Sequence, residues 1–308
     1  MGCGPCERFE SRLSINPGWY VILYHDVSWE DSILSRTVGG CCPPDLFERQ
    51  VNELRGLGQI VTVEQGIEAL HSGIVREPLF SLWFDDGLRG VYRNAYPLLS
   101  YHGLTAAVSV CSAFTLRKEL FWRHQLSFLA HIDGMRHLRS RLRRYGYQLP
   151  TSVKQFTCEN LSIKMRQEIQ NVFDAVTTPE FRQATHNLFM NTEELKGLHN
   201  NGWTLANHTA RHYRMAAGFG PQELLADFQD CEIFLRDMGG SRFWVLPFGF
   251  PKKPADLCDD FFAEADRWLV FVGNRMNKSR QEENILYRID APISEQPLRC
   301  RLEELSRR

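Results

Sequence analysis

Short apolar runs, rich in β-branched and aromatic residues and separated by helical segments, restrict the fold of this chain more than any other feature. Seven such runs occur, at residues 20–24, 59–63, 79–84, 105–110, 203–206, 243–246 and 268–272. Most are apolar at consecutive positions instead of alternating, so both faces of each strand are expected to be covered. This pattern predicts a parallel sheet wrapped by helices.

The segments between the runs have helical spacing and recognisable ends. One begins at Asp45, which is a plausible N-cap with Glu48 three residues later, and it ends at Gly58. Another opens with Pro221 and ends before Gly239. Because strand and helix alternate along the chain, we predict an α/β fold of barrel type.

The stretch between the fourth and fifth runs interrupts this alternation, because it is helical throughout. We interpret residues 113–190 as a helical insertion over one end of the barrel. Its segment 136–144 holds five arginines and no acid. That segment is either a solvated helix face or a contact for an anionic group. The predicted domains are an N-terminal extension (1–18), the barrel with its insertion (19–290) and a C-terminal tail (291–308).

Composition excludes several classes of protein. Of the 308 residues, 43% are hydrophobic and 24% are charged, which is typical of a folded chain and not of a disordered one. Lys plus Arg (36) nearly cancels Asp plus Glu (37), so no overall field attracts nucleic acid or an anionic membrane. No apolar run reaches the length of a membrane span.

The N-terminus and the cysteines bear on the compartment. The first residues lack the apolar segment of a signal peptide, and nine cysteines at irregular spacing do not resemble a secreted disulfide framework. We therefore expect a cytoplasmic protein. Cys3 and Cys6, together with Cys41 and Cys42, leave a four-thiolate zinc site open as an alternative use of these thiols.

Two groups of polar residues directly follow predicted strands. Asp85 and Asp86 come after the third run, and Gly87 lets the backbone turn sharply. His208 and His212 come after the fifth run, and residues four apart on one helical turn can bind one metal ion. In parallel α/β barrels the carboxyl ends of the strands meet at one mouth, where catalytic groups gather. Each pattern alone also fits an ordinary loop; together they indicate a site.

These residues resemble the motifs of the polysaccharide deacetylases with NodB homology, which are similar to carbohydrate esterase family 4. The segments that carry the resemblance, which covers roughly residues 19–290, are 83–87 (WFDDG), 208–212 (HTARH), 24–27 (YHDV), 96–99 (YPLL) and 247–249 (PFG). The resemblance implies a distorted seven-stranded (β/α) barrel.

The resemblance also implies roles for individual residues. Asp86, His208 and His212 correspond to the family's metal ligands, which leave positions open for water and substrate. Asp85 corresponds to the general base. The backbone N–H of Phe248 corresponds to an oxyanion donor, and Pro247 and Gly249 would hold that substrate-binding loop.

The chain departs from the family pattern in three places. Residues 268–274 stand where the family has an Asp-x-x-Asp-Trp motif. Residues 244–246 (WVL) stand where the family has an arginine that orients the catalytic aspartate, and residues 286–290 (LYRID) stand where it has a general-acid histidine. His25, which follows the first run, is a candidate for the missing acid. The alternative for His25 is a buried, hydrogen-bonded histidine without a catalytic role.

The expected function is that of a metal-dependent deacetylase acting on carbon–nitrogen bonds other than peptide bonds. It would remove an N-linked acyl group, most simply acetyl, from an amino sugar or glycan precursor. Zn²⁺ suits a ligand set of two imidazoles and one carboxylate, as do Ni²⁺, Co²⁺ and Fe²⁺. Two alternatives stay open, namely hydrolysis of a non-peptide C–N or ester bond in a small metabolite, and non-catalytic glycan binding.

Overall fold

The computed structural model describes residues 15–29, 32–35, 40–147, 162–214, 219–248, 267–278, 284–293 and 296–306. Seven strands form a closed ring in which every neighbouring pair is parallel. In ring order these are β1 (Gly18–Tyr24), β10 (Ile285–Asp290), β9 (Trp268–Val272), β8 (Phe243–Val245), β7 (Thr204–Asn207), β6 (Ala107–Val110) and β5 (Pro78–Phe84). The ring closes because β1 also pairs with β5. The predicted seven-stranded (β/α) barrel is confirmed.

The ring uses six of the seven predicted runs. The run at 59–63 forms only the two-residue strand β4 (Gln59–Ile60), which pairs with β5 outside the ring. It ends early because Thr62 caps the next helix, its Oγ1 accepting a hydrogen bond from the Gln65 N–H. The seventh ring strand is β10, which we did not predict because Arg288 interrupts its apolar pattern.

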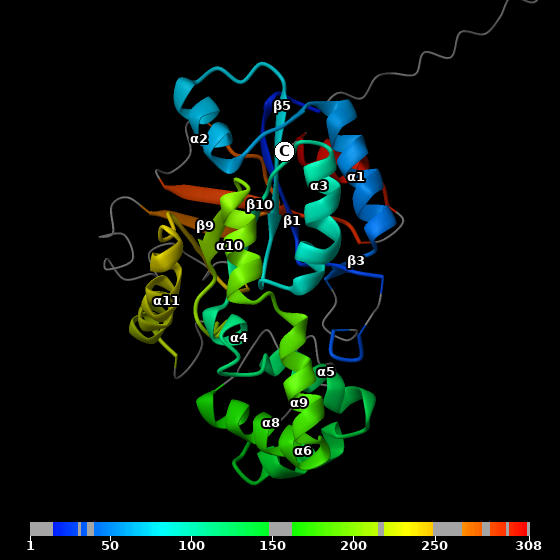
Figure 1. The fold of residues 1–308 in the computed structure, drawn as a ribbon, viewed down its shortest axis with the longest axis vertical. Helices are drawn as coiled ribbons and strands as arrows, with labels where there is room; N and C mark the ends of the chain where they lie inside the picture. The colour runs from blue at the N-terminus through cyan, green and yellow to red at the C-terminus, as the bar shows by residue number, and fades with distance from the viewer. Residues whose placement is uncertain are drawn as a thin grey trace, which may run out of the picture.

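Helices cover the outside of the barrel (Figure 1). They include α1 (Pro44–Leu57), α3 (Tyr96–Tyr101), α10 (Thr192–Asn200), α11 (Pro221–Leu235) and α13 (Leu298–Ser306), whereas α2 (Val63–Ser72) lies across one end of the barrel. Both helices predicted from end signals are present. In the first, Pro43 and not Asp45 occupies the N-cap position, without a side-chain hydrogen bond to the helix, and Asp45 lies in the first turn. The second continues through the 3₁₀ turn η3 (Arg236–Met238) to Gly239, whose left-handed backbone ends it.

Alternate residues of β1 face two different apolar cores. Trp19, Val21 and Leu23 belong to a cluster inside the barrel, and helix α2 closes one end of that cluster. Tyr20 and Ile22 belong to the larger cluster between the strands and the helices. The consecutive apolar residues of the strands therefore reflect burial on both faces, as predicted from the sequence.

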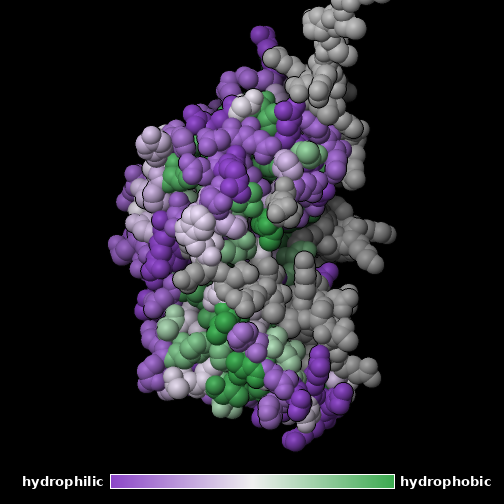
Figure 2. Space-filling view, turned by 90° about the vertical axis from the view of Figure 1, so that its right-hand side faces the viewer, coloured by the Kyte–Doolittle hydropathy of each residue, from purple (hydrophilic) through white to green (hydrophobic). Residues whose placement is uncertain are grey.

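The helical insertion forms a second lobe below the barrel in Figure 1. Its described helices are α4 (Ser112–Thr115), α5 (Trp122–His131), α6 (Met135–Arg143), α8 (Ile163–Val176) and α9 (Pro179–Thr185), followed by the 3₁₀ turn η2 (His186–Leu188). The lobe has an apolar cluster of its own. Hydrophobic residues also gather on its surface, below a mostly hydrophilic barrel face (Figure 2). Since α4 directly follows β6, the lobe stands at the carboxyl ends of the strands.

The limits of the predicted domains stay a prediction. The segment assigned to the C-terminal tail contains α13, whose Leu298, Leu302 and Leu305 join the same core as Tyr20 of β1.

Two further strands, β2 (Asp26–Val27) and β3 (Cys41–Cys42), pair beside the barrel. Among the described residues, no helix combines the length and apolar character needed to cross a membrane.

Helix α2 packs against the apolar cluster at one end of the barrel, and this contact gives a stability prediction. Gly66 of α2 lies against Trp19, where a β-carbon would overlap the indole ring, and that ring is held by its Nε1–H donating to Ser81 Oγ at 2.9 Å. We expect Gly66→Ala to lower the free energy of unfolding by about 1–3 kcal/mol through overpacking, measured by urea denaturation.

Gly56 of α1 provides the matched control, because no atom lies within 4 Å of a β-carbon placed there. Gly56→Ala should leave stability unchanged or raise it by up to about 1 kcal/mol, following helix propensity. Equal effects of the two substitutions would show that the contact with Trp19 does not limit position 66.

Candidate metal centre

The turn after β5 places two carboxylates at the barrel mouth. The Asp85 N–H donates to the Tyr24 carbonyl oxygen, which holds the turn to the neighbouring strand. Asp86 and Gly87 both adopt left-handed backbone conformations, with φ of 70° and 72°. Such a conformation is uncommon for a residue with a β-carbon and tends to cluster at functional sites.

The same backbone feature recurs in the other segments of the site. Thr209, His212 and Phe248 have φ of 66°, 56° and 61°. The Asn207 side chain accepts from the Thr209 N–H, and the Thr209 hydroxyl accepts from the His212 N–H, so local hydrogen bonds support the strained loop after β7. The histidines therefore lie on a hydrogen-bonded turn and not on the regular helix that their spacing suggested.

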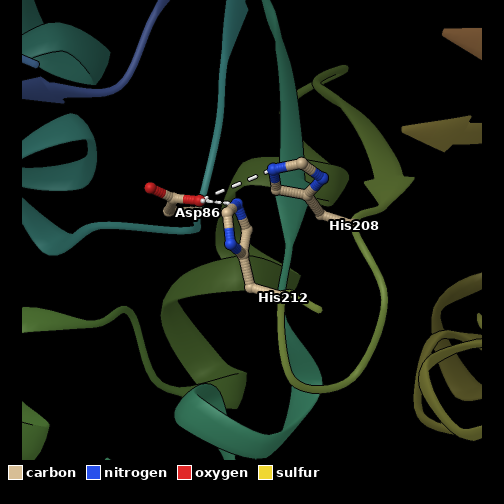
Figure 3. A group of neighbouring side chains, drawn as sticks. All are labelled: Asp86, His208 and His212. Carbon is tan, nitrogen blue, oxygen red and sulfur yellow. Dashed lines mark ion pairs between the residues drawn. The ribbon is translucent and has the colours of Figure 1, made fainter. Parts of the chain in front are cut away.

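Asp86, His208 and His212 converge at one point (Figure 3). Asp86 Oδ1 lies 3.5 Å from His208 Nε2 and 3.3 Å from His212 Nε2. One potential ligand atom from each of the three residues lies within 4.8 Å of the others, and all three residues are buried. Two ligands about 2.1 Å from a tetrahedral zinc ion are about 3.4 Å apart, so this spacing suits a single ion.

Hydrogen bonding and burial orient the histidines. His208 Nδ1 lies 2.8 Å from the Val245 carbonyl oxygen, which can only accept, so Nδ1 donates to it and Nε2 is the nitrogen that faces Asp86. Burial, with the nearby His208 as a second cause, holds the pKa of His212 well below its ordinary value. The rings of Phe121 and Phe248 pack against His212 at centroid distances of 5.2 and 4.8 Å.

The charge balance tests whether these residues fit a metal ion. Asp86 Oδ1 is buried and has no hydrogen-bond donor among the described residues. A buried carboxylate oxygen without a donor or cation is costly. A divalent cation in contact with both imidazoles would compensate this oxygen, so the ligand set and its charge fit such an ion.

Asp85, next to the three potential ligands, has a protein partner of its own. Arg288 of β10 donates from Nη1 to Asp85 Oδ1 at 2.6 Å, and the Ser109 hydroxyl donates to the same oxygen. The other oxygen, Oδ2, lies 3.7 Å from His208 Nε2. Burial is the largest single influence and opposes ionisation of Asp85. The charges of Arg288, His208 and His25, together with the hydrogen bond from Arg288, outweigh it, so the pKa of Asp85 lies well below its ordinary value. Asp85 is therefore ionised at neutral pH.

Arg288 was not among the site residues predicted from the sequence. Residues 244–246, in front of Pro247, contain no arginine that could orient Asp85, and the structure supplies one from a different strand. The side chain of Arg288 is completely buried, and its guanidinium lies over the Trp83 ring at 5.3 Å. A single arginine inside the otherwise apolar segment 285–289 was the signal that could have revealed both the strand and the ion pair.

Of the other predicted site residues, Phe248, Pro247 and His25 lie in the described part of the chain. Phe248 packs on His212, and Pro247 is buried beside it, whereas Gly249 lies outside the described residues. His25 is partly buried at the end of β1, with the Gly40 backbone close to its ring. His25 is near enough to Asp85 and His212 to interact with both electrostatically.

The alternative zinc site involves Cys3 and Cys6, which also lie outside the described residues. The thiols of Cys41 and Cys42 donate to the backbone carbonyl oxygens of Ser28 and Pro43. Among the described residues, Asp86, His208 and His212 form the group of three or more potential ligands close enough to hold a metal ion.

No protein-family model and no curated protein sequence matches the chain. Solved structures do. IcaB from Ammonifex degensii is 15% identical with a TM-score of 0.59, covering 95% of this chain and 98% of IcaB. The deacetylase PplD of Streptococcus pyogenes, solved with acetate, is 14% identical with a TM-score of 0.59, covering 94% and 99%. A de-N-acetylase from Aggregatibacter actinomycetemcomitans is 16% identical with a TM-score of 0.56, covering 88% and 94%. The chain has the fold of the polysaccharide deacetylases.

The buried ion pair generates a second stability prediction. Arg288→Met should lower the free energy of unfolding by about 3–5 kcal/mol, because it leaves Asp85 buried without its cation. The double variant Arg288→Met, Asp85→Asn should recover much of this loss, since no charge is then left unpaired. Chemical denaturation of the wild type, both single variants and the double variant measures the coupling.

The loss should also depend on pH. The native pKa of Asp85 is lowered, so the pair stabilises the protein above the ordinary carboxyl pKa of about 4, and this contribution falls as the pH drops below that value. The cost of Arg288→Met should therefore be larger at pH 7 than at pH 3.5. A cost that stays constant over this range would contradict the assigned pair.

Proposed function

We propose that this protein is a metal-dependent hydrolase that removes an N-linked acyl group, most simply acetyl, from an amino sugar or glycan precursor. One observation carries the proposal: a buried cluster of a carboxylate and two imidazoles lies beside an ionised aspartate at the carboxyl ends of the barrel strands. The fold, shared with deacetylases that include one solved with acetate, supports it.

Asp86, His208 and His212 would hold the ion, with Zn²⁺ favoured and Ni²⁺, Co²⁺ or Fe²⁺ also suited to these ligands. When bound, a divalent ion supplies Lewis acidity, which polarises the acyl oxygen and lowers the pKa of water towards about 7. Three protein ligands leave coordination positions open, which is typical of catalytic and not of structural zinc sites.

Asp85 would act as the general base. Its Oδ1 is occupied by Arg288 and Ser109, whereas Oδ2 lies on the side of His208. That second oxygen would take the proton as water attacks the acyl carbon. Arg288 is then a positioning residue, since it fixes the orientation of the carboxylate and keeps it ionised.

His25 would donate the proton that the leaving amine requires, because a free amide anion is too basic to depart at neutral pH. Its position at the end of β1, near Asp85 and His212, supports this role. The Phe248 backbone N–H would donate to the oxyanion that develops on the acyl oxygen, with Pro247 and Gly249 holding the loop.

The cytoplasmic location stays a prediction, to be tested by cell fractionation.

Substitution of the base and of one ligand should have different effects. Asp85→Asn should lower kcat for an N-acetylated amino sugar by about 10²–10⁴-fold while the protein keeps its metal. His208→Ala should lose both activity and metal. Amine release and elemental analysis of the purified proteins measure the two effects. Exposed Asp237→Asn and His199→Ala are the matched controls and should change neither quantity. Full turnover by metal-loaded Asp85→Asn would remove Asp85 as the base.

Chelation gives a related expectation. Prolonged dialysis against a chelator should abolish amine release, and addition of Zn²⁺ or another suitable divalent ion should restore it. Activity that persists in protein shown by elemental analysis to be free of metal would contradict metal dependence.

The role of His25 can be tested through the leaving group. His25→Asn should lower kcat for an N-acetylated amino sugar by about 10²-fold or more, since the amine must be protonated to leave. The same variant should hydrolyse a nitrophenyl acetate ester at close to the wild-type rate, because nitrophenolate leaves without protonation. Exposed His137→Asn is the control. Equal losses on both substrates would contradict an acid role.

A further inference from the structure

Asp227, on helix α11, is a buried carboxylate to which the proposed reaction gives no task. It is only 3% exposed, and it does not belong to the cluster of potential metal ligands. A carboxylate is costly to bury unless hydrogen bonds and opposite charge compensate it. The groups that compensate Asp227 therefore show which part of the molecule it holds in place.

All three residues between the two histidines donate hydrogen bonds to Asp227. The Thr209 hydroxyl donates to its carboxylate, and the Ala210 N–H donates to its backbone carbonyl oxygen at 2.9 Å. Arg211 donates twice, from its backbone N–H to Oδ2 at 3.0 Å and from Nη1 to Oδ1 at 2.8 Å. A single residue of α11 thus binds the whole segment that joins one histidine to the other.

This segment needs support from outside, because its backbone is strained. Thr209 and His212 have φ of 66° and 56°, which is uncommon for residues with a β-carbon and most of all for a β-branched one. Such a conformation persists where the surrounding structure holds it. The Thr209 hydroxyl that donates to Asp227 also accepts from the His212 N–H at 2.9 Å. The hydroxyl therefore links the buried carboxylate to the backbone of a potential ligand.

The same segment sets the spacing of the two imidazoles. His208 directly follows β7 and precedes the turn, whereas His212 ends the turn, so a change in the turn moves one ring relative to the other. The ring centroids are 4.7 Å apart, and both Nε2 atoms face Asp86 Oδ1 (Figure 3). Metal–ligand distances tolerate changes of only about 0.2 Å. The affinity for an ion should therefore depend on how firmly the turn is held.

Arg211 has further acidic partners, which differ from Asp227 in what they bond. Its Nε donates to Glu119 Oε1 and its Nη1 to Asp230 Oδ2, both at 2.9 Å. These two carboxylates bond to the guanidinium, whereas Asp227 also bonds to the backbone of the turn. Asp230 lies three residues after Asp227 on α11, and its side chain is 53% exposed. It provides a matched control for the charge of Asp227.

We propose that Asp227 is a positioning residue, which holds residues 208–212 in the conformation in which both imidazoles face Asp86. The inference rests on the proposed function and deepens it, because it names a residue that sets the metal affinity of the centre from outside the ligand set. Partners that orient metal ligands typically change the affinity by about 10–100-fold.

The test measures the Kd of the metal-free protein for Zn²⁺ by competition with a chromogenic chelator. Asp227→Asn keeps the side-chain volume but replaces one acceptor oxygen by an amide nitrogen that cannot accept, and it should raise Kd by about 10–100-fold. Thr209→Val, which removes the bridging hydroxyl, should also raise Kd. Asp230→Asn should leave Kd unchanged. Circular dichroism checks that each variant is folded, and Thr209→Val carries the test if Asp227→Asn does not fold.

An unchanged Kd in folded Asp227→Asn, or an equal rise in Asp230→Asn, would overturn the proposal. If the wild type binds Zn²⁺ but releases no amine from N-acetylated amino sugars, the proposed function fails, and the Kd values still decide the role of Asp227. If the wild type binds no Zn²⁺, amide hydrogen exchange of the peptide spanning residues 208–212 decides it. Faster exchange in Asp227→Asn than in the wild type and Asp230→Asn supports the assigned role, whereas equal exchange overturns it.

Discussion

Burial of two adjacent carboxylates at the end of β5 is the constraint on which the rest of the site depends. A buried carboxylate must be compensated by a cation or by several hydrogen bonds. Asp85 is compensated within the chain, by Arg288 and Ser109. Asp86 Oδ1 has no donor in the described part of the chain but faces two imidazole nitrogens. This difference divides the tasks between neighbours, because one carboxylate is held ionised by the protein and the other suits a bound cation.

Closure of the barrel makes this division possible. β10 joins β9 to β1, and β1 joins β10 to β5, so an arginine near the end of the chain reaches an aspartate that is 203 residues earlier. Side chains two apart along a strand point to the same face. Leu286 belongs to the core inside the barrel, and Arg288, two residues later, therefore also points inward. Its guanidinium lies over the Trp83 ring, and its Nη1 donates to Asp85.

The helical lobe contributes to the same centre although it has its own apolar core. Phe121 and Trp122, at the beginning of α5, pack against His212 and Phe248. Those contacts exclude water from one side of the potential ligands. The lobe and the barrel thus meet at the residues that the proposed reaction uses.

The sequence by itself determined the fold class, most of the strands and the identity of the converging residues, because burial on both strand faces and short motifs at strand ends are local properties. Asp85, Asp86, His208 and His212 were all identified before their geometry was known. The structure alone decided that β10 completes the ring and that Arg288 pairs with Asp85. It also decided that the histidines lie on a strained turn. Pairing between distant strands and compensation of buried charge depend on contacts across the whole chain, and no local pattern encodes which partner will arrive.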